Sequence, residues 1–379
     1  MNFDEHAAKA LLRRFGLVTP EGRIAQTPEE AEAAAFELGP CVVKAQVPTG
    51  KRGKAGGIRL AATPGQAKDH AEAILGMDIA SWTVEKLLIE TKVPIAHELY
   101  VAILNDTASM GPVLLFSPMG GMDVEEAAEK HSGAMRRFEI PISDGLSEKT
   151  ALAAIEGLGL EAAASALAAA LLNLYHAYRG LDAELIEINP LVVTTDNRVV
   201  ALDCKLTVDD SAAPRQGEIA ALAAKEKQTP LEAKAAAEGL KYIELDGSVG
   251  VLANGAGLTM TTMDVIAHYG GRPANFLEIG GEAYTKAKIA LTILLENPNV
   301  RSLLVNFCGA FARTDVMAEG VVSAWEELKP DIPIVFTIHG TGEDEAIALV
   351  ENRLGLTSYN LMDDAVKAAI AASQGKAVV

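Results

Sequence analysis

The sequence predicts two α/β domains of different kinds: an N-terminal α+β domain with a largely antiparallel sheet, and a C-terminal domain with a doubly wound parallel sheet. In the first half, strand-like and helix-like runs follow one another without strict alternation. In the second half, a strand, a loop of small residues and a helix recur three times, which is the pattern of βαβ crossovers. At 379 residues the chain is also too long for one ordinary core.

The first half opens with a short amphipathic helix, in which Leu11, Leu12 and Phe15 share a face and Gly16 ends the helix. β-Branched and alternating runs predict strands at residues 42–44, 58–60, 87–90, 97–104, 112–116, 184–188 and 199–203, and an Ala-rich run predicts a helix at 160–178. A helical, charged stretch from about 211 to 240 precedes the change of pattern. We therefore expect a first domain at 1–228, a linker at 229–245 and a second domain at 246–379.

The second half carries predicted strands at 249–252, 303–306 and 334–337. A loop of small or polar residues follows each strand, at 254–257, 309–313 and 339–342. In a doubly wound sheet, ligands sit beyond the carboxyl ends of the strands, where helix N-termini also point. All three loops are therefore expected on one binding edge.

Composition limits the classes of function. A formal net charge of −18 argues against a nucleic-acid partner, which would need a broad cationic face. The acidic start does not resemble a secretory signal, and the longest apolar run, at 162–172, is too short to span a bilayer. Cys41, Cys204 and Cys308 form no CxxC pair and each lies in or beside an apolar run, so we expect buried thiols and a cytoplasmic protein without a membrane span.

A basic, glycine-rich loop at residues 45–57 reverses this acidic charge locally. It holds Lys51, Arg52 and Lys54 among four glycines, with no acid, between two strand-like runs. Glycine lets backbone N–H groups turn toward a ligand, and Lys and Arg donate charge-assisted hydrogen bonds to phosphate oxygens. The loop is either a phosphate-binding flap or a solvated basic turn, and by itself it favours neither.

A predicted hairpin supplies oxygen ligands. The pair Asp196-Asn197 favours a turn between the runs 184–193 and 199–205. Strand alternation then puts Glu187, Asn189 and Asp203 on one face, a set suited to a Mg²⁺ that also holds nucleotide phosphates. A solvated polar face is the alternative. The basic loop in the same domain makes a Mg-nucleotide site the better explanation of both features.

Several motifs in order carry a family resemblance. They are Val42-Val43-Lys44, the segment 50–57, Glu98-Leu99-Tyr100, Glu187-Ile188-Asn189-Pro190-Leu191-Val192, Leu202-Asp203-Cys204-Lys205 and Asn254-Gly255-Ala256-Gly257-Leu258. From residue 1 to about 371 the chain resembles the β subunits of the succinyl-CoA synthetase family, which are ATP-grasp acid–thiol ligases. The resemblance implies an ATP-grasp domain followed by a flavodoxin-like CoA-ligase domain. It also implies cleavage of ATP or GTP to NDP and phosphate, and thioester formation with CoA through an acyl phosphate and a phosphohistidine.

The resemblance extends to single positions. It implies nucleotide contacts at Lys44, Lys51, Arg52, Gly53, Glu90, Val93 and Glu98, and Mg²⁺ ligands at Asn189 and Asp203. Glu187 resembles the glutamate that meets the phosphohistidine, and Asn254 with Ala310, Phe311 and Ala312 resembles the acyl-substrate contacts. The implied partner is an α subunit that carries the CoA site and the phosphohistidine, in an αβ or α2β2 assembly.

The chain departs from the family pattern around the acyl substrate. Phe311 replaces a smaller aliphatic residue, Glu282 stands where the family has glycine, and Thr337 and His339 stand where it has an Arg and an acid. The carboxylate is therefore succinate, malate or another small dicarboxylate, and a non-catalytic nucleotide-sensing subunit is a third reading. His339 could itself carry phosphate, but a lone loop histidine is more often a hydrogen-bonded surface residue. The base, adenine or guanine, is left open.

Overall fold

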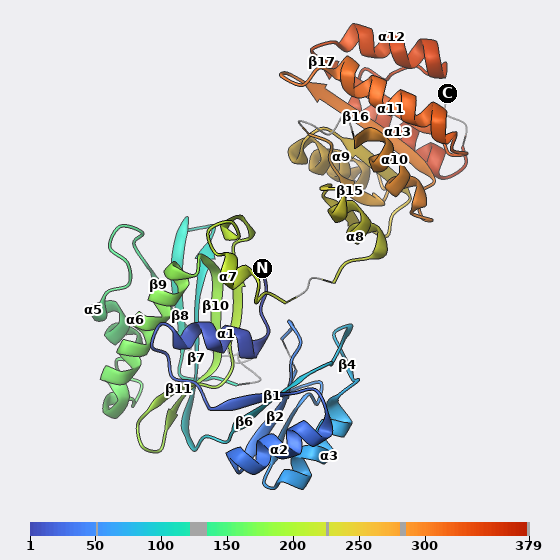
Figure 1. Cartoon of the computed structure of the whole chain (residues 1–379). Coiled ribbons are helices and arrows are strands. Elements are labelled where there is room, and N and C mark those ends of the chain that lie inside the picture. The colour runs from blue at the N-terminus through green and yellow to red at the C-terminus, as the bar shows by residue number, and fades with distance from the viewer. Residues whose placement is uncertain (51, 122–134, 225–226, 281–285, 377–379) are drawn as a thin grey trace. The chain divides into compact units, whose positions relative to one another are not determined.

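The computed structural model describes residues 1–379 except 51, 122–134, 225–226, 281–285 and 377–379 (Figure 1). Lys51 and Glu282, both singled out from the sequence, lie outside the described residues. The chain divides into two compact units, Met1–Glu226 and Lys227–Val379. In the part of the chain that is described, we find no helix with the length and apolar character needed to cross a membrane.

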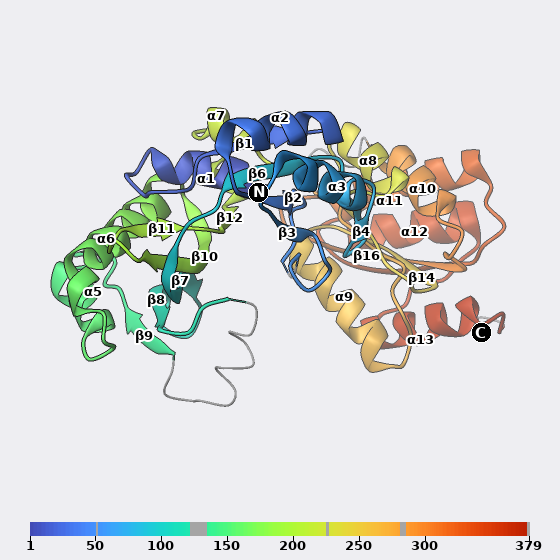
Figure 2. The ribbon, with the colours of Figure 1, turned by 90° about the horizontal axis from the view of Figure 1, so that it is seen from below.

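The first unit contains a small antiparallel sheet in the order β1 (Gly22–Ala25), β6 (Leu87–Thr91), β2 (Cys41–Ala45), β3 (Ile58–Ala61). Helices α2 (Pro28–Leu38) and α3 (Pro64–Ile74) lie side by side on it (Figure 2). Each helix begins after a threonine whose hydroxyl caps the first turn, with proline next. Small buried side chains, including Ala31, Ala35, Ala67 and Ala71, let the helices approach the sheet closely.

A larger sheet completes the first unit, in the order β11 (Val199–Ala201), β10 (Ala183–Thr194), β7 (Ile95–Asp106), β8 (Gly111–Ser117), β9 (Arg136–Glu139), with β12 (Lys205–Val208) also paired to β10. Its core includes residues of α1 (Glu5–Arg13), α5 (Glu148–Ile155) and α6 (Ala164–Gly180). The remaining short elements are β4 (Asp78–Ile79), β5 (Trp82–Thr83), α7 (Gly217–Ala220) and two 3-10 turns, at Glu161–Ala163 and Asp210–Ala212.

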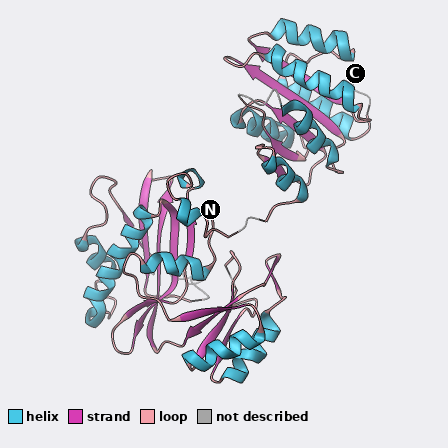
Figure 3. Ribbon diagram, viewed as in Figure 1, coloured by secondary structure: helices cyan, strands magenta, loops and turns pink. Residues whose placement is uncertain are grey.

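The second unit is built on a parallel sheet in the order β14 (Val249–Ala253), β16 (Ser302–Gly309), β17 (Ile334–Gly340). Alternate strand residues pack in opposite directions. Val305 and Phe336 join the core with α10 (Ala287–Glu296), α11 (Thr314–Leu328) and α12 (Glu343–Leu354), whereas Leu304 and Val335 join α9 (Ala256–His268) and α13 (Met362–Ser373). The ribbon in Figure 3 shows these helices beside the strands. Helices therefore cover both faces, and the expected doubly wound parallel sheet is confirmed.

The segment 229–245, expected from the sequence to be a linker, carries regular structure. It forms α8 (Pro230–Ala237), which begins with a capping box between Thr229 and Glu232, and β13 (Tyr242–Glu244). Strand β13 pairs with β15 (Asn275–Leu277), and Leu240 and Tyr242 are buried in the core of the second unit. In the structure these residues are therefore part of the second unit.

Candidate active site

The hairpin that carries Asn189 and Asp203 keeps one register from Leu185 to Val193 of β10, with a shift only between Ala183 and Leu185. Strand β10 pairs with two successive strands, β11 and β12, which a short gap separates. Val192 of β10 faces Val200 in β11, and Glu187 of β10 faces Lys205 in β12. Counting inward from either pair places Asn189 opposite Asp203. Glu187 and Asn189 are two residues apart in β10, where alternate residues share a face, and Asp203 lies in the connection between β11 and β12.

The side chains of Asn189 and Asp203 each accept hydrogen bonds from other residues of this chain. The side chain of Asn189 accepts from the backbone N–H of Gly121 at 2.7 Å and donates to its carbonyl at 3.0 Å. Arg52 Nη2 donates to the two carboxylate oxygens of Asp203 at 2.6 and 2.7 Å. Among the described residues no group of three or more His, Cys, Asp or Glu side chains is arranged for a metal. Asn189 and Asp203 carry oxygens of the kind that Mg²⁺ binds, and Mg²⁺ usually takes one or two carboxylates and completes its shell with phosphates and water.

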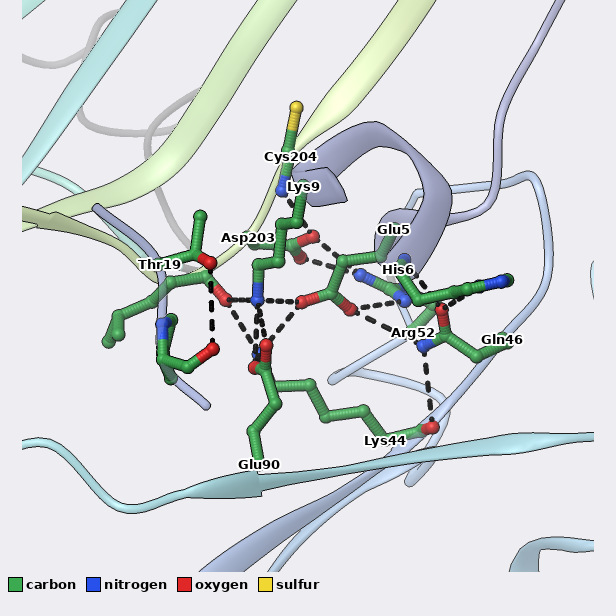
Figure 4. Close-up of polar contacts among 12 residues, drawn as sticks. Glu5, His6, Lys9, Thr19, Lys44, Gln46, Arg52, Glu90, Asp203 and Cys204 are labelled. Atoms are coloured by element: carbon green, nitrogen blue, oxygen red, sulfur yellow. Dashed lines mark hydrogen bonds and ion pairs between the residues drawn. The ribbon is translucent and has the colours of Figure 1, made fainter. Parts of the chain in front are cut away.

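Asp203 is the outer member of a group that we call the buried charge cluster: Glu5, Lys9, Lys44, Arg52, Glu90 and Asp203 (Figure 4). Nitrogen to oxygen distances in it are 2.6 Å for Lys9–Glu5 and Lys9–Glu90, 2.7 Å for Lys44–Glu90, 2.9 Å for Lys44–Glu5 and 2.8 Å for Arg52–Glu5. With three carboxylates and three cations, the cluster has no net formal charge.

Local structure explains how these side chains meet. Glu5 and Lys9 are four residues apart on α1 and so share one helix face. Glu90 in β6 faces Val42 in β2, and Lys44, two residues along β2, lies on the same side of that ladder. Arg52 leaves the loop between β2 and β3, where it also donates to the carbonyl of Ala45 at 2.9 Å. The cluster thus joins α1, the small sheet and the end of β11.

Burial and charge oppose one another in this group. Burial alone would raise the pKa of the Glu5 carboxyl, but Lys44, Lys9 and Arg52 hold that pKa well below its usual range. Burial would lower the pKa of the Lys44 ammonium, yet Glu5, Glu90 and Asp203 together raise it. Glu5 is therefore ionised and Lys44 protonated at neutral pH, and each charge is buried only because opposite charges surround it.

The structure brings together only some of the residues predicted to contact nucleotide. Lys44, Arg52 and Glu90 meet in the cluster, and Gly53 follows Arg52 in the loop. Val93 is half-buried in the connection between β6 and β7, and Glu98 is exposed on β7. Neither has a recorded contact with the cluster, and both lie on the chain segment that leads from the small sheet to the large one.

Sequence reasoning missed Glu5 and Lys9. A signal was present, because residues 5, 9 and 12 lie along one face of α1, and Leu12 is fully buried. Two opposite charges on the apolar face of a helix must be paired with each other or with charges elsewhere. Their partners Glu90 and Lys44, at 81 and 39 residues' separation, carry no such local signal.

The carboxyl edge of the second sheet is held together by backbone and amide contacts. Asn254 accepts from the N–H of Cys308 at 2.8 Å and donates to its carbonyl at 2.9 Å, which joins the ends of β14 and β16. Cys308 itself is exposed, so the expectation of a buried thiol is wrong there, whereas Cys41 and Cys204 are buried. Cys308 lies one residue before the end of β16, on the face that carries Leu304 and Asn306, whereas Phe307 on the other face is fully buried.

Thr341 joins the loops after β16 and β17. Its N–H donates to Gly309, its hydroxyl to Ala310, and its carbonyl accepts from Thr314. The backbones approach so closely that a Cβ on Gly340 would lie 2.0 Å from the Gly309 carbonyl oxygen. The side chain of Phe311, between Ala310 and Ala312, is fully exposed, with a relative accessibility of 105%.

His339 lies within β17 rather than in the loop after it. Its Nδ1 is 3.4 Å from Glu343, and its Nε2 is 3.5 Å from the Thr337 hydroxyl, so it is a hydrogen-bonded, partly exposed residue. A polar pocket of about 340 Å³, lined in part by Ser248, Arg272 and Arg301, lies at the opposite edge, where the strands begin. The carboxyl-edge loops take no part in lining it.

Comparison with known proteins assigns each unit to a protein family. Residues 2–193 match the ATP-grasp domain family, and residues 252–372 match the CoA-ligase family. An ATP-grasp domain followed by a CoA-ligase domain defines an ATP-grasp acid–thiol ligase. The chain is 43% identical to the GDP-forming succinate–CoA ligase β subunit of Thermus thermophilus over 100% of both chains. It is 47% identical to the ADP-forming β subunit of Rubrobacter xylanophilus over 92% of both. The chain belongs to the succinate–CoA ligase β-subunit family.

A solved structure shares the fold. The structure of ATP citrate lyase from Methanothrix soehngenii in complex with citrate and coenzyme A matches with a TM-score of 0.73, covering 97% of this chain and 98% of that one. At 23% identity this likeness supports the fold alone.

Proposed function

We propose that this chain is the nucleotide-binding subunit of a ligase that forms an acyl-CoA from a small carboxylate such as succinate. ATP or GTP would be cleaved to NDP and phosphate, with Mg²⁺ bound beside the nucleotide. The single observation that carries the proposal is the contact of Arg52, from the basic glycine-rich loop, with Asp203, which lies opposite Asn189. This contact supports a site in which a phosphate-type donor lies beside an oxygen-bearing side chain of the hairpin.

The roles of the residues follow from their chemistry. Lys44 and Arg52 would neutralise phosphate oxygens, and Asn189 and Asp203 would hold the metal, which when bound supplies charge neutralisation between the phosphates. Glu90 points into the cluster, so its contribution to nucleotide binding would be the position of Lys44. Val93 and Glu98 would contact the nucleotide from the connection between the two sheets.

The second unit would bind the carboxylate. The N–H groups at the start of α9 have no side-chain cap, and a helix N-terminus attracts an anion. Asn254 and the loop of Ala310, Phe311 and Ala312 lie at the same edge of the sheet. Because Asn254 already bridges to Cys308, it would orient the loop as well as contact the ligand.

The partner would be an α subunit with the CoA site and the phosphohistidine, in an αβ or α2β2 assembly. The relatives are named β subunits, which supports a partner of this kind. Glu187 would meet the phosphohistidine when it reaches the nucleotide. His339 is a poor candidate for that histidine because it already faces Glu343.

The test is transfer of radiolabelled phosphate from ATP or GTP in the purified complex with its α subunit. We expect acid-labile label on the partner chain and none on this one, and thioester only when CoA and a carboxylate are added. Lys44→Met should abolish labelling, whereas Arg215→Gln, which removes an exposed ion pair in the same unit, should not. Label at His339 of this chain, or full labelling with Lys44→Met, would contradict the proposal.

The metal assignment has a separate test. Asn189→Ala and Asp203→Ala should each raise the Mg²⁺ concentration needed for ADP binding, because each removes an oxygen ligand. Calorimetric titration of ADP at several Mg²⁺ concentrations measures this. An unchanged Mg²⁺ dependence in both variants would remove these residues from the metal site.

A further inference from the structure

Two lysines in the cluster bind the same oxygens. Lys9 Nζ lies 2.6 Å from Glu5 Oε1 and 2.7 Å from the Leu202 carbonyl, and Lys44 Nζ lies 2.9 and 2.6 Å from these two atoms. Both ammonium groups also contact the Glu90 carboxylate. Two like charges can share one set of acceptors only because two carboxylates and a carbonyl surround them.

The two lysines differ in what they can reach. The Lys9 side chain is 1% exposed, and all its recorded contacts are to oxygens inside the cluster. The Lys44 side chain is 9% exposed and lies at the end of the strand that leads into the basic loop. Lys9 therefore supports the site from within, and Lys44 is the one placed to meet a ligand.

Lys9 is needed for the charge balance of the buried charge cluster. With Lys9 present, three cations balance the three carboxylates Glu5, Glu90 and Asp203, and Lys44 and Arg52 keep attraction for an arriving phosphate. Without it, the three carboxylates exceed the two remaining cations, and both of those cations are held more tightly by the acids. The field at the phosphate position then becomes less positive.

Lys9 also holds the peptide that carries Asp203. Its bond to the Leu202 carbonyl fixes the residue immediately before Asp203. Lys44 binds the same carbonyl, so the two lysines tie the end of β11 to α1 and to the small sheet. Loss of Lys9 would leave Lys44 to satisfy this carbonyl as well as both carboxylates.

The geometry points to Lys9 as a positioning residue for phosphate binding: it is the internal counter-charge that leaves Lys44 available to the nucleotide. This inference rests on the proposed nucleotide site. It assigns Lys9 no contact with the nucleotide and assigns its effect to charge balance with Glu5.

The test is a double-mutant cycle on ADP affinity in the complete complex, measured by calorimetry at saturating Mg²⁺. Lys9→Met should weaken ADP binding by about 10- to 100-fold, the usual effect of losing an outer partner of a binding site. Lys9→Met with Glu5→Gln removes one charge of each sign, so most of the lost affinity should return. Leu12→Ala, on the same face of α1, is the matched control, which should lower the melting temperature and leave ADP affinity unchanged.

Each outcome either supports or contradicts the inferred role of Lys9. Unchanged affinity in Lys9→Met, or losses that simply add in the double variant, would make Lys9 a structural residue only and overturn the inference. If Lys9→Met does not fold, Lys9→Gln, which can still donate to the Leu202 carbonyl, takes its place. A charge-balanced double variant that also fails to fold counts against the inference, because restored balance would not have restored the site.

Lys44→Met separates this inference from the function on which it rests. If Lys44→Met retains full ADP affinity, the nucleotide site itself is misassigned. If Lys44→Met loses ADP binding while Lys9→Met does not, only the role of Lys9 fails.

Discussion

In the first unit, the charged side chains of the candidate site are buried against one another, whereas in the second unit the corresponding loops are tied by backbone and expose their side chains. Glu5 and Lys9 are almost completely buried, but Phe311 is fully exposed. The difference indicates two ways to prepare a site. The first unit holds ligand-type charges in place with its own counter-charges, and the second holds a loop in place and leaves its surface to be covered by a ligand or partner.

The largest effect should come from removing a charge from the buried charge cluster of the first unit. Glu5→Gln leaves Lys44 and Arg52 short of one buried carboxylate, so we expect it to lower the free energy of unfolding of the first unit by about 3–5 kcal/mol. Arg215→Gln, which breaks the exposed pair with Asp182 in the same unit, should cost about 1 kcal/mol or less. Chemical denaturation of both variants measures the contrast. Equal, small losses would show that the cluster contributes no more than a surface pair.

A substitution in the exposed loop of the second unit should change substrate specificity and leave the stability of the protein unchanged. Phe311→Ile should change the ratio of kcat/KM between succinate and a hydroxylated dicarboxylate by about 10- to 200-fold, as single pocket contacts do. Because Phe311 is fully exposed, the melting temperature should not move. Substrate profiling of the complex measures the ratio. If succinate is preferred over every analogue both before and after the change, the departure at Phe311 has no bearing on the substrate.

A smaller effect is expected at the proposed metal site, which includes Asp203. Arg52 occupies both oxygens of Asp203, so it competes with a cation for that carboxylate. We expect Arg52→Gln to increase the affinity for Mn²⁺ in the absence of nucleotide by about tenfold, within the usual range of coupling between ligands. Titration followed by electron paramagnetic resonance measures this, with Asp203→Asn as the control that should bind no Mn²⁺ at this site. Unchanged affinity in Arg52→Gln would mean that the ion pair does not restrict the metal.

The smallest effect of the cluster should be its pH dependence near neutrality. The pKa of Glu5 is lowered in the folded chain, so its contribution is present above the ordinary glutamate pKa of 4.5 and is lost as pH falls through the lowered value. The pKa of Lys44 is raised, so its contribution is complete below 10.5 and is lost only at higher pH. The stability difference between wild type and Glu5→Gln should therefore be flat between about pH 5.5 and 9.5 and shrink below pH 4.5. A slope across the neutral range would contradict these shifts.

Much of the fold could be predicted because local sequence patterns determine many of its strands and turns. Alternating and β-branched runs located β2, β7, β10 and β16, and the turn at Asp196-Asn197 set the register that puts Asn189 opposite Asp203. The segment 229–245 could not be assigned, since β13 has three residues and forms only by pairing with β15. The exposure of Cys308 depends on how far the neighbouring elements cover its face at the end of β16, which an apolar pattern alone does not report.

The sequence indicates single candidate residues, and the contacts that join them into a cluster come only from the structure. Lys44, Arg52 and Asp203 were identified from charge and motif, yet nothing local indicates that Lys44 faces Glu5 or that Arg52 reaches Asp203, 151 residues away. Ion pairs over such separations depend on the packing of whole sheets. The sequence therefore indicates which side chains are candidates, and the tertiary structure decides which of them neutralise one another.

The bond between Lys9 and the Leu202 carbonyl also sets an order of events during synthesis, because it spans 193 residues. Ribosomes add about 5–20 residues per second, so α1 is synthesised about 10–40 s before its last acceptor. During that interval Glu5, Lys9, Lys44 and Glu90 can pair among themselves, but Arg52 lacks Asp203. The helix at the start of the chain thus completes its contacts only when the first unit is nearly finished. A nascent chain arrested before residue 202 would hold α1 loosely, and proteolysis of stalled ribosome complexes would detect it.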